Sequence, residues 1–422
     1  MKLGKLSFVL AACAVCIGGF STKGATMYET NAQDKEVLYD LDELLTPVWE
    51  GGICYQESVL PVMGENYEFA PIQLLYPIEQ IIEVKSATLT KTYEEGYDYG
   101  VADGKLVIDP DGDIPIMSYQ EFHPTTGQFP SKKGGYLCFN EGSYFHERQI
   151  VVTYKTSEKY TGYVPEGKGE LLPNIRKKLD GGERIHMLVF GDSISVGANS
   201  SGFTGVSPYL PTYSKLFSAG LEAEYGSKVI VHNHSLGGMN TQWGVDNIQS
   251  VLSKTPDLDF AIVAFGMNDA GLNGGAYVEQ INQIVSAIQA KNPTTDILLI
   301  GSMLPNPDSF VWQNQVGFVD YLLTNCERGG VAVADVTHVH EYLLTKKAYS
   351  DMTGNNINHP NDYLARVYAQ TLLKTLRDKD KAPSDGLENQ AGKGGCSSTA
   401  SLSGAGIALS VAVAATAKKR RK

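Results

Sequence analysis

From residue 184 onward, short apolar runs alternate with longer stretches of helical periodicity. The apolar runs span 185–190, 228–233, 259–265, 296–302 and 331–336. Helical patterns cover 212–225, 241–254, 275–291, 311–327 and 337–347, and a last one repeats Leu364, Tyr368, Leu372 and Leu376 on one face. Alternating strands and helices predict a parallel sheet with helices on both faces, a three-layer α/β domain over residues 184–380.

Residues 26–160 carry a different pattern, without sustained helical periodicity. Runs typical of β-strands occur at 82–85, 87–93, 105–108 and 149–154, separated by turns rich in Gly, Asp and Pro. This pattern predicts a small β-sandwich, whose many aromatic residues fit a packed core, although a separate sugar-binding role for them stays open. Residues 161–183, which contain several Pro and Gly, are predicted to link the two domains.

The first 25 residues have the pattern of a secretion signal. Lys2 and Lys5 precede an apolar stretch over 6–20, and small residues follow it. The four residues ending at Cys13 also fit a lipoprotein cleavage pattern, and a buried helix is a third interpretation. We expect the chain to be exported.

The other end of the chain predicts attachment to the cell surface. A polar, Gly- and Ser-rich linker at 381–398 precedes the uncharged stretch 399–417 and the basic run 418–422. A helix of this length, at about 1.5 Å a residue, just spans a bilayer core of roughly 30 Å, and the basic end would stay cytoplasmic. The arrangement over 399–422 resembles bacterial surface-sorting tails. An unanchored basic tail, cleavage of the tail and modification of Cys396 stay open.

Charge narrows the class of partner. The chain has a formal net charge of −12. Residues 1–25 hold three lysines and no acid, and 418–422 hold five basic residues, so the remaining body has 27 basic against 47 acidic side chains, a net charge of −20. Such a body disfavours nucleic acid and anionic lipid surfaces, and it fits a neutral substrate. The sequence assigns no oligomeric state.

The cysteines indicate no metal site. Six are present, two of them in the predicted signal. Cys54 and Cys138 are candidates for a disulfide within the N-terminal domain, which stays open, and Cys326 falls in a helical pattern. No Cys and His spacing typical of a metal site occurs after the signal, so no metal or cofactor is predicted.

Four residues suited to ester hydrolysis stand where predicted strands end or helices begin. The first strand ends at Ser193, the second leads to a turn with Gly238, and the third leads to Asn268. His359 stands just before the last helix. Because the carboxyl ends of parallel strands share one sheet edge, all four are predicted to meet there.

The chemistry of ester hydrolysis requires these residue types. Ser193 would attack an ester carbonyl, and His359 would take the hydroxyl proton and return it to the leaving alcohol. The backbone N–H groups of Ser193 and Gly238 and the side-chain amide of Asn268 would stabilise the oxyanion.

The blocks around these residues resemble those of the SGNH (GDSL-type) hydrolases, over about residues 185–380. The matching positions are Gly191-Asp192-Ser193-Ile194, Gly238, Gly266-Met267-Asn268-Asp269 and His359-Pro360-Asn361. The resemblance implies a flavodoxin-like sheet, with Ser193 as nucleophile, Gly238 and Asn268 as oxyanion donors and His359 as base.

The sequence departs from the family at the residue that orients the histidine. The family has an acid three residues before the histidine, where this chain has Asn356. An amide oxygen can orient the imidazole but cannot stabilise its charged form. Either neutral acceptors such as Asn356 orient His359, or another acid such as Asp351 does, or the domain is inactive. Asp362, in the first turn of the last helix, is predicted to cap that helix instead.

The predicted substrate is acylated carbohydrate, with acetyl as the simplest acyl group. Export, an acidic body and an N-terminal β-domain resembling two-domain carbohydrate acetylesterases favour this, and the polar segment 198–204 would not line a long acyl channel. Two alternatives stay open: a lipid or thioester acyl hydrolase of the same family, and a non-catalytic surface protein that binds glycans.

Overall fold

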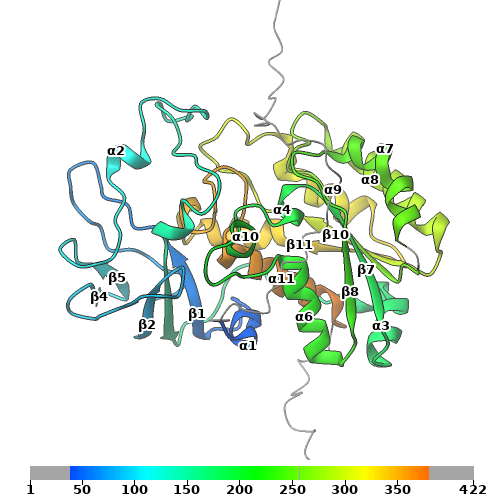
Figure 1. Ribbon diagram of the computed structural model, residues 1–422, viewed down its shortest axis with the longest axis horizontal. Helices are drawn as coiled ribbons and strands as arrows, with labels where there is room; N and C mark the ends of the chain where they lie inside the picture. Colours follow the sequence, from blue (N-terminus) through cyan, green and yellow to red (C-terminus); the bar gives the residue numbers. More distant parts are fainter. Residues whose placement is uncertain (1–38, 256, 380–422) are drawn as a thin grey trace, which may run out of the picture. The chain divides into compact units, whose positions relative to one another are not determined.

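The computed structural model describes residues 39–255 and 257–379. Its C-terminal part is built on a parallel sheet of β7 (Ile185–Gly191), β8 (Val229–Asn233), β9 (Phe260–Ala264), β10 (Asp296–Gly301) and β11 (Val331–Asp335). The strands lie in the order β11-β10-β9-β7-β8, and Figure 1 shows this sheet among the helices of the C-terminal part. Numbered along the chain, this is the 2-1-3-4-5 order of flavodoxin-like sheets. The predicted three-layer α/β fold is confirmed.

Helices cover both faces of this sheet because its strands are apolar on both sides. Leu188 and Phe190 of β7 pack with α7 (Thr241–Lys254), α8 (Gly274–Lys291) and α9 (Phe318–Asn325). Met187 and Val189, which point to the other face, pack with α3 (Pro173–Asp180), α6 (Tyr213–Tyr225), α10 (Val336–Leu344) and α11 (Asp362–Leu376). Successive residues of a strand alternate between faces, so one run builds two cores.

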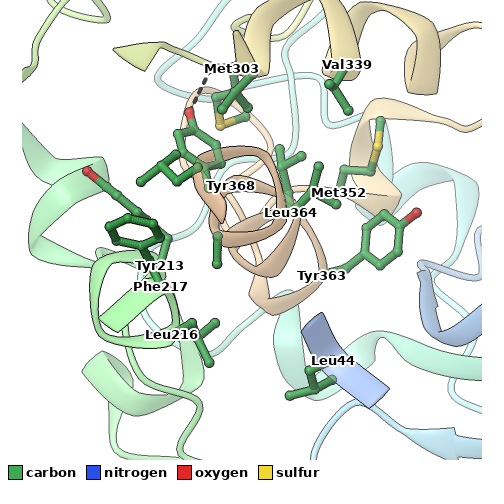
Figure 2. Packing of buried hydrophobic residues seen from close by; sticks show 14 of the residues in the cluster. Leu44, Tyr213, Leu216, Phe217, Met303, Val339, Met352, Tyr363, Leu364 and Tyr368 are labelled. Carbon is green, nitrogen blue, oxygen red and sulfur yellow. Dashed lines mark hydrogen bonds between the residues drawn. The ribbon is translucent and has the colours of Figure 1, made fainter. Parts of the chain in front are cut away.

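The last helix, α11, lies inside the second core (Figure 2). Tyr368 packs against Tyr213 of α6, with ring centroids 5.2 Å apart, and Leu44 of α1 (Leu41–Leu45) belongs to the same cluster as Leu364. The hydroxyl of Tyr368 accepts a hydrogen bond from the backbone N–H of Met303, 2.6 Å away, just after β10. Asn361 caps the helix through the N–H of Leu364. This packing fixes the loop before α11, which carries His359.

The N-terminal β region, residues 39–160, contains an antiparallel sheet in the order β1-β6-β2-β3 and a separate hairpin, β4-β5. Its strands are β1 (Gly52–Val59), β2 (Gln80–Ser86), β3 (Thr92–Tyr93), β4 (Tyr99–Ala102), β5 (Lys105–Ile108) and β6 (Ile150–Thr156), and α2 (Tyr119–Phe122) lies between β5 and β6. The antiparallel region ahead of the α/β part is confirmed. The pattern missed β1, because Glu57 and Ser58 are polar but buried and a register shift between Cys54 and Glu57 breaks the alternation.

The sheet of the N-terminal β region packs into the same core as α11. Val59, Val152 and Tyr154 belong to the apolar cluster that holds Leu364. A buried ion pair joins the two parts: Lys347 Nζ lies 2.6 Å from Glu57 Oε1. The two parts therefore share one core, and the described residues belong to one compact unit.

Short elements complete the fold. They are α4 (Ser193–Val196), α5 (Ser201–Thr204), and the 3₁₀ helices η2 (His146–Arg148), η3 (Gly169–Leu171), η4 (Asn314–Gly317) and η5 (Tyr349–Asp351). The helix predicted over 311–327 is shorter, because Gly317 interrupts it and the side chain of Gln315 bonds to the backbone of Val311 and Gln313.

Several predictions on the chain ends lie outside the described residues, namely the signal at 1–25, the linker at 381–398 and the tail at 399–422. Within residues 39–255 and 257–379, no helix has the length and apolar character needed to cross a bilayer. Cys54, Cys138 and Cys326 are all free thiols, so the pairing of Cys54 with Cys138 is not formed. Burial raises the pKa of the Cys54 thiol to about 12, which keeps it protonated.

Candidate active site

The chain places Ser193 at the carboxyl end of β7, as the first residue of α4. Asp192 caps this short helix by accepting from the backbone N–H of Ile194. Gly191 must lack a side chain, since a Cβ there would lie 2.4 Å from the carbonyl oxygen of Ala264. β7 can therefore end close against β9. Ser193 then begins a helix, and the first N–H groups of a helix have no acceptor within it.

Ser193 and His359 meet directly. The imidazole Nε2 of His359 lies 2.8 Å from Ser193 Oγ. Both residues are nearly buried: Ser193 is 8% exposed and His359 is 9% exposed. Nε2 must carry a lone pair to accept the serine proton, so the neutral ring holds its own proton on Nδ1. The pair has the geometry of a nucleophile and its general base.

A tight turn over 353–360 holds His359 in place. Thr353 Oγ1 and the N–H of Gly354 both donate to the carbonyl oxygen of His359, at 2.7 and 3.0 Å. The side-chain oxygen of Asn355 accepts from the N–H groups of Ile357, Asn358 and His359. These bonds fix the backbone of the histidine, and with it the direction of the ring.

The Nδ1 side of the ring faces three polar side chains. Nδ1–H donates to Asn199 Oδ1, 2.6 Å away. The nitrogen of the Asn355 amide lies 3.0 Å from Nδ1, and Glu141 Oε2 lies 3.6 Å from it. Asn199 fixes the tautomer because its own amide nitrogen donates to the carbonyl oxygen of Gly142, which leaves its oxygen for His359.

The two residues predicted to orient His359 do not contact the ring. Asn356, at the position of the family's acid, has a positive φ of 62° and donates its amide to the carbonyl oxygen of Cys138. Asp351 is buried in η5, where its carboxylate accepts from the N–H groups of Leu60 and Ala348. Both side chains are thus bonded elsewhere, and the side-chain oxygen of Asn356 also accepts from the amide of Asn306 at 3.2 Å. The prediction that either orients His359 is therefore corrected.

Asp362 has a different role from the predicted cap. Asn361 caps α11, whereas Asp362 Oδ1 accepts from the N–H of Ser201 at 2.9 Å. This bond ties the start of α11 to α5, shortly after the nucleophile.

Gly238 and Asn268 lie at the same sheet edge as Ser193. The N–H of Leu236 donates to the carbonyl oxygen of Gly191, so the turn after β8 runs beside the end of β7. Gly238 has a φ of 76°, which favours glycine, and a Cβ on Gly237 would lie 3.8 Å from that of Ser193. Asn268 donates one amide proton to the carbonyl oxygen of Met239, 3.0 Å away. The other proton is left to serve an oxyanion.

Local sequence patterns mark the three residues around Nδ1 of His359 to different degrees. Asn355 directly precedes Asn356, the position of the family's acid, in an asparagine-rich stretch before His359. Asn199 closely follows the nucleophile, which is a weak hint. Glu141 is separated from His359 by more than two hundred positions and lies in the N-terminal β region. No local pattern marks it, because a contact between distant segments leaves no periodic trace.

The described residues contain no group of three or more His, Cys, Asp or Glu side chains placed to hold a metal ion. The site brings together a serine hydroxyl, an imidazole, backbone and amide N–H donors and a nearby carboxylate.

Residues 189–367 match the GDSL-like lipase/acylhydrolase family. These residues form a GDSL-like lipase/acylhydrolase domain. The matched range contains Ser193, Gly238, Asn268 and His359, and it excludes Glu141. Of the three polar side chains on the Nδ1 side of His359, Asn199 and Asn355 thus lie inside the matched range and Glu141 lies outside it.

The hydrolase domain is also similar to solved structures. A two-domain esterase active on acetylated mannans is 19% identical, with 53% of this chain and 59% of that chain covered and a TM-score of 0.41. A catalytic mutant of an acetylxylan esterase from Geobacillus stearothermophilus is 13% identical, covering 46% and 94%, with a TM-score of 0.38. A lipolytic G-D-S-L family member from Veillonella parvula DSM 2008 is 15% identical, covering 45% and 97%, with a TM-score of 0.36.

The match spans 59% of the length of that two-domain esterase. No curated protein matches the chain.

Proposed function

We propose that the protein is an exported serine esterase that removes small acyl groups, acetyl above all, from carbohydrate. The contact between Ser193 Oγ and His359 Nε2, at 2.8 Å, carries the assignment of the reaction type. It joins a nucleophile at the end of β7 to a base whose tautomer Asn199 fixes on the far side of the ring.

The reaction follows from this geometry. Ser193 Oγ attacks the ester carbonyl carbon as its proton moves to Nε2 of His359. The N–H groups of Ser193 and Gly238 and the amide of Asn268 stabilise the oxyanion. The imidazolium returns the proton to the leaving alcohol, which leaves an acyl-serine. Water then attacks the acyl-serine as Nε2 takes its proton, and that proton passes to Ser193 Oγ as the acyl–oxygen bond breaks and the carboxylic acid is released.

The polar surroundings of the base support a hydroxyl-rich substrate. Asn199, Asn355 and Glu141 bring amide and carboxylate groups to the edge of the imidazole, and Glu141 is half-exposed. The half-exposed carboxylate of Glu141 can accept a hydrogen bond from a sugar hydroxyl, whereas Asn199 and Asn355 are buried and already bonded within the protein. The body's net charge of −20 also disfavours anionic lipid surfaces.

Gly237, beside Ser193, and Phe310, on the loop after β10, support a short acyl group and a sugar ring. Gly237 approaches Ser193 without a side chain between them. Phe310 is 60% exposed on the loop after β10, next to Ser309, which pairs with Ser131 of the N-terminal β region. An exposed aromatic face suits the apolar face of a sugar. The proposal includes export and attachment at the cell surface, which the sequence patterns of residues 1–25 and 399–422 support.

The test is turnover by the purified full chain. We expect acetate release from acetylated mannan or acetylated xylan, and hydrolysis of p-nitrophenyl acetate that falls as the acyl chain lengthens to octanoate. Ser193→Ala should reduce both to background. The matched control is Ser195→Ala, which removes another serine hydroxyl of α4, bonded to Tyr213 of α6. This variant should keep turnover. Rates that rise with acyl length would favour a lipid substrate, and no turnover on any short-chain ester would refute the proposal.

A further inference from the structure

The N-terminal β region contributes a carboxylate to the catalytic base. We infer that Glu141 is the positioning residue that stabilises the imidazolium of His359, in place of the acid that the hydrolase family carries within its own domain. The inference rests on the proposed serine mechanism and adds the N-terminal β region to the catalytic unit.

The hydrogen bonds around the ring leave the charge unmatched without Glu141. Nδ1–H donates to Asn199, whose amide oxygen is neutral. That bond orients the ring and fixes the tautomer, but it gives little compensation when Nε2 takes the serine proton. Within residues 39–255 and 257–379, the ion pair recorded for His359 is with Glu141 Oε2, at 3.6 Å from Nδ1.

Asn355 connects the carboxylate to the ring. Its oxygen accepts three backbone N–H groups, so its amide nitrogen must face the ring and Glu141. That nitrogen donates to Glu141 Oε1 at 3.3 Å and to Asn358 Oδ1 at 3.1 Å. Glu141 is therefore held by a neutral donor beside the ring, with its second oxygen toward Nδ1.

The segment that carries Glu141 is fastened to the hydrolase domain on both sides. Asn356 donates to the carbonyl oxygen of Cys138, and Asn199 donates to that of Gly142, each at 3.0 Å. Earlier in the same segment, the N–H of Lys132 donates to the carbonyl oxygen of Asp308 at 2.8 Å. The carboxylate is thus placed by bonds to the same loops that hold His359 and follow Ser193.

The ionisation of Glu141 agrees with this role. Partial burial raises the pKa of its carboxyl, but the bond and charge of His359 and the amides of Asn355 and Asn199 outweigh it and bring the pKa below its ordinary value. The lowered pKa favours the ionised form of Glu141, and an ionised carboxylate favours the charged imidazole formed during attack.

The experiment measures Ser193 activation in two ways, by kcat on p-nitrophenyl acetate and by the rate at which an aryl phosphonate labels Ser193. The label needs the Ser–His pair but no particular substrate. Glu141→Gln should lower both rates at least about tenfold, with KM changed less than about twofold. Glu147→Gln, which removes an exposed carboxylate bonded to Ser143 in the same segment, is the matched control and should leave both rates unchanged.

A second variant separates charge from structure. Glu141→Gln combined with Asn355→Asp exchanges the amide and the carboxylate, and it puts the charge at the atom 3.0 Å from Nδ1. This pair should recover most of the lost labelling rate. A Glu141→Gln variant that labels at the wild-type rate would overturn the inference, as would a double variant that recovers nothing. Labelling of Ser193 without turnover of any ester would refute the proposed function, and the labelling rates would still decide the role of Glu141.

Discussion

The side-chain amide of Asn356 donates to the backbone carbonyl oxygen of Cys138, 3.0 Å away. Asn356 occupies the position where the hydrolase family carries the acid that orients its histidine. In this chain Asn356 binds the N-terminal β region instead, at Cys138, which lies three residues before Glu141. A residue that would elsewhere act on the base thus anchors the segment whose carboxylate reaches it.

Restoring the family's acid should therefore lower both the stability of the chain and the proposed activity. Asn356→Asp replaces a donor with a carboxylate oxygen facing the carbonyl of Cys138, at a site only 2% exposed. We expect a loss of about 1–3 kcal/mol in unfolding free energy, because a buried acceptor is left unpaired. kcat should fall because Glu141 shifts away from His359. Urea denaturation and ester kinetics measure both, and a variant more active than wild type would contradict this interpretation.

Asn268 should contribute to the transition state rather than to substrate binding. Its amide is held by the carbonyl oxygen of Met239, so it is preorganised for the oxyanion. We expect Asn268→Ala to lower kcat by about 10²–10³ with little change in KM. Asn273→Ala, which removes the cap of α8, is the control and should cost stability but not kcat. An unchanged kcat in Asn268→Ala would exclude this role.

The ion pair between Lys347 and Glu57 should be critical for stability. Glu57 also accepts from Tyr154 and from the N–H of Leu75, and both charged side chains are almost fully buried. Lys347→Met leaves the carboxylate without a counter-charge and should cost about 3–5 kcal/mol. The double variant Glu57→Gln/Lys347→Met should be less destabilised, as measured by urea midpoints. Equal losses would mean that the uncompensated charge is not the cause.

Asp192 should make stability depend on pH. Burial raises the pKa of its carboxyl to about 7, and the charge of Asp269 acts in the same direction. Hydrogen bonds from the backbone N–H groups of Ile194 and Met267 lower this pKa but do not cancel the effect of burial. Because the folded pKa lies above that of the unfolded chain, the native state binds more protons between about pH 4 and 7, and stability falls as pH rises through this window.

Asp192→Asn tests this dependence, since an amide does not titrate. The stability of the variant relative to wild type should rise by up to about 4 kcal/mol between pH 4 and 7. Urea denaturation at a series of pH values measures the difference. A difference that stays constant with pH would show that Asp192 does not titrate in this range.

Sequence periodicity was sufficient for most of the α/β domain. The pattern at 241–254 became α7 over the same residues, and the five apolar runs became the five parallel strands within one or two residues. Local apolar periodicity determines these elements, because each must bury its own face. It failed for β1, where buried polar residues serve contacts with η5 and Lys347 that the local sequence does not contain.

The sequence by itself determined the candidate nucleophile Ser193, the candidate base His359 and the sheet edge where they meet, since the two residues stand at strand and helix ends that the topology brings together. Only the tertiary structure decided what supports the base. Asn199 and Glu141 reach His359 because a loop after the nucleophile and a segment of the N-terminal β region pack against the same turn. Such contacts depend on how separate segments pack in space, and chain order alone carries no record of that packing.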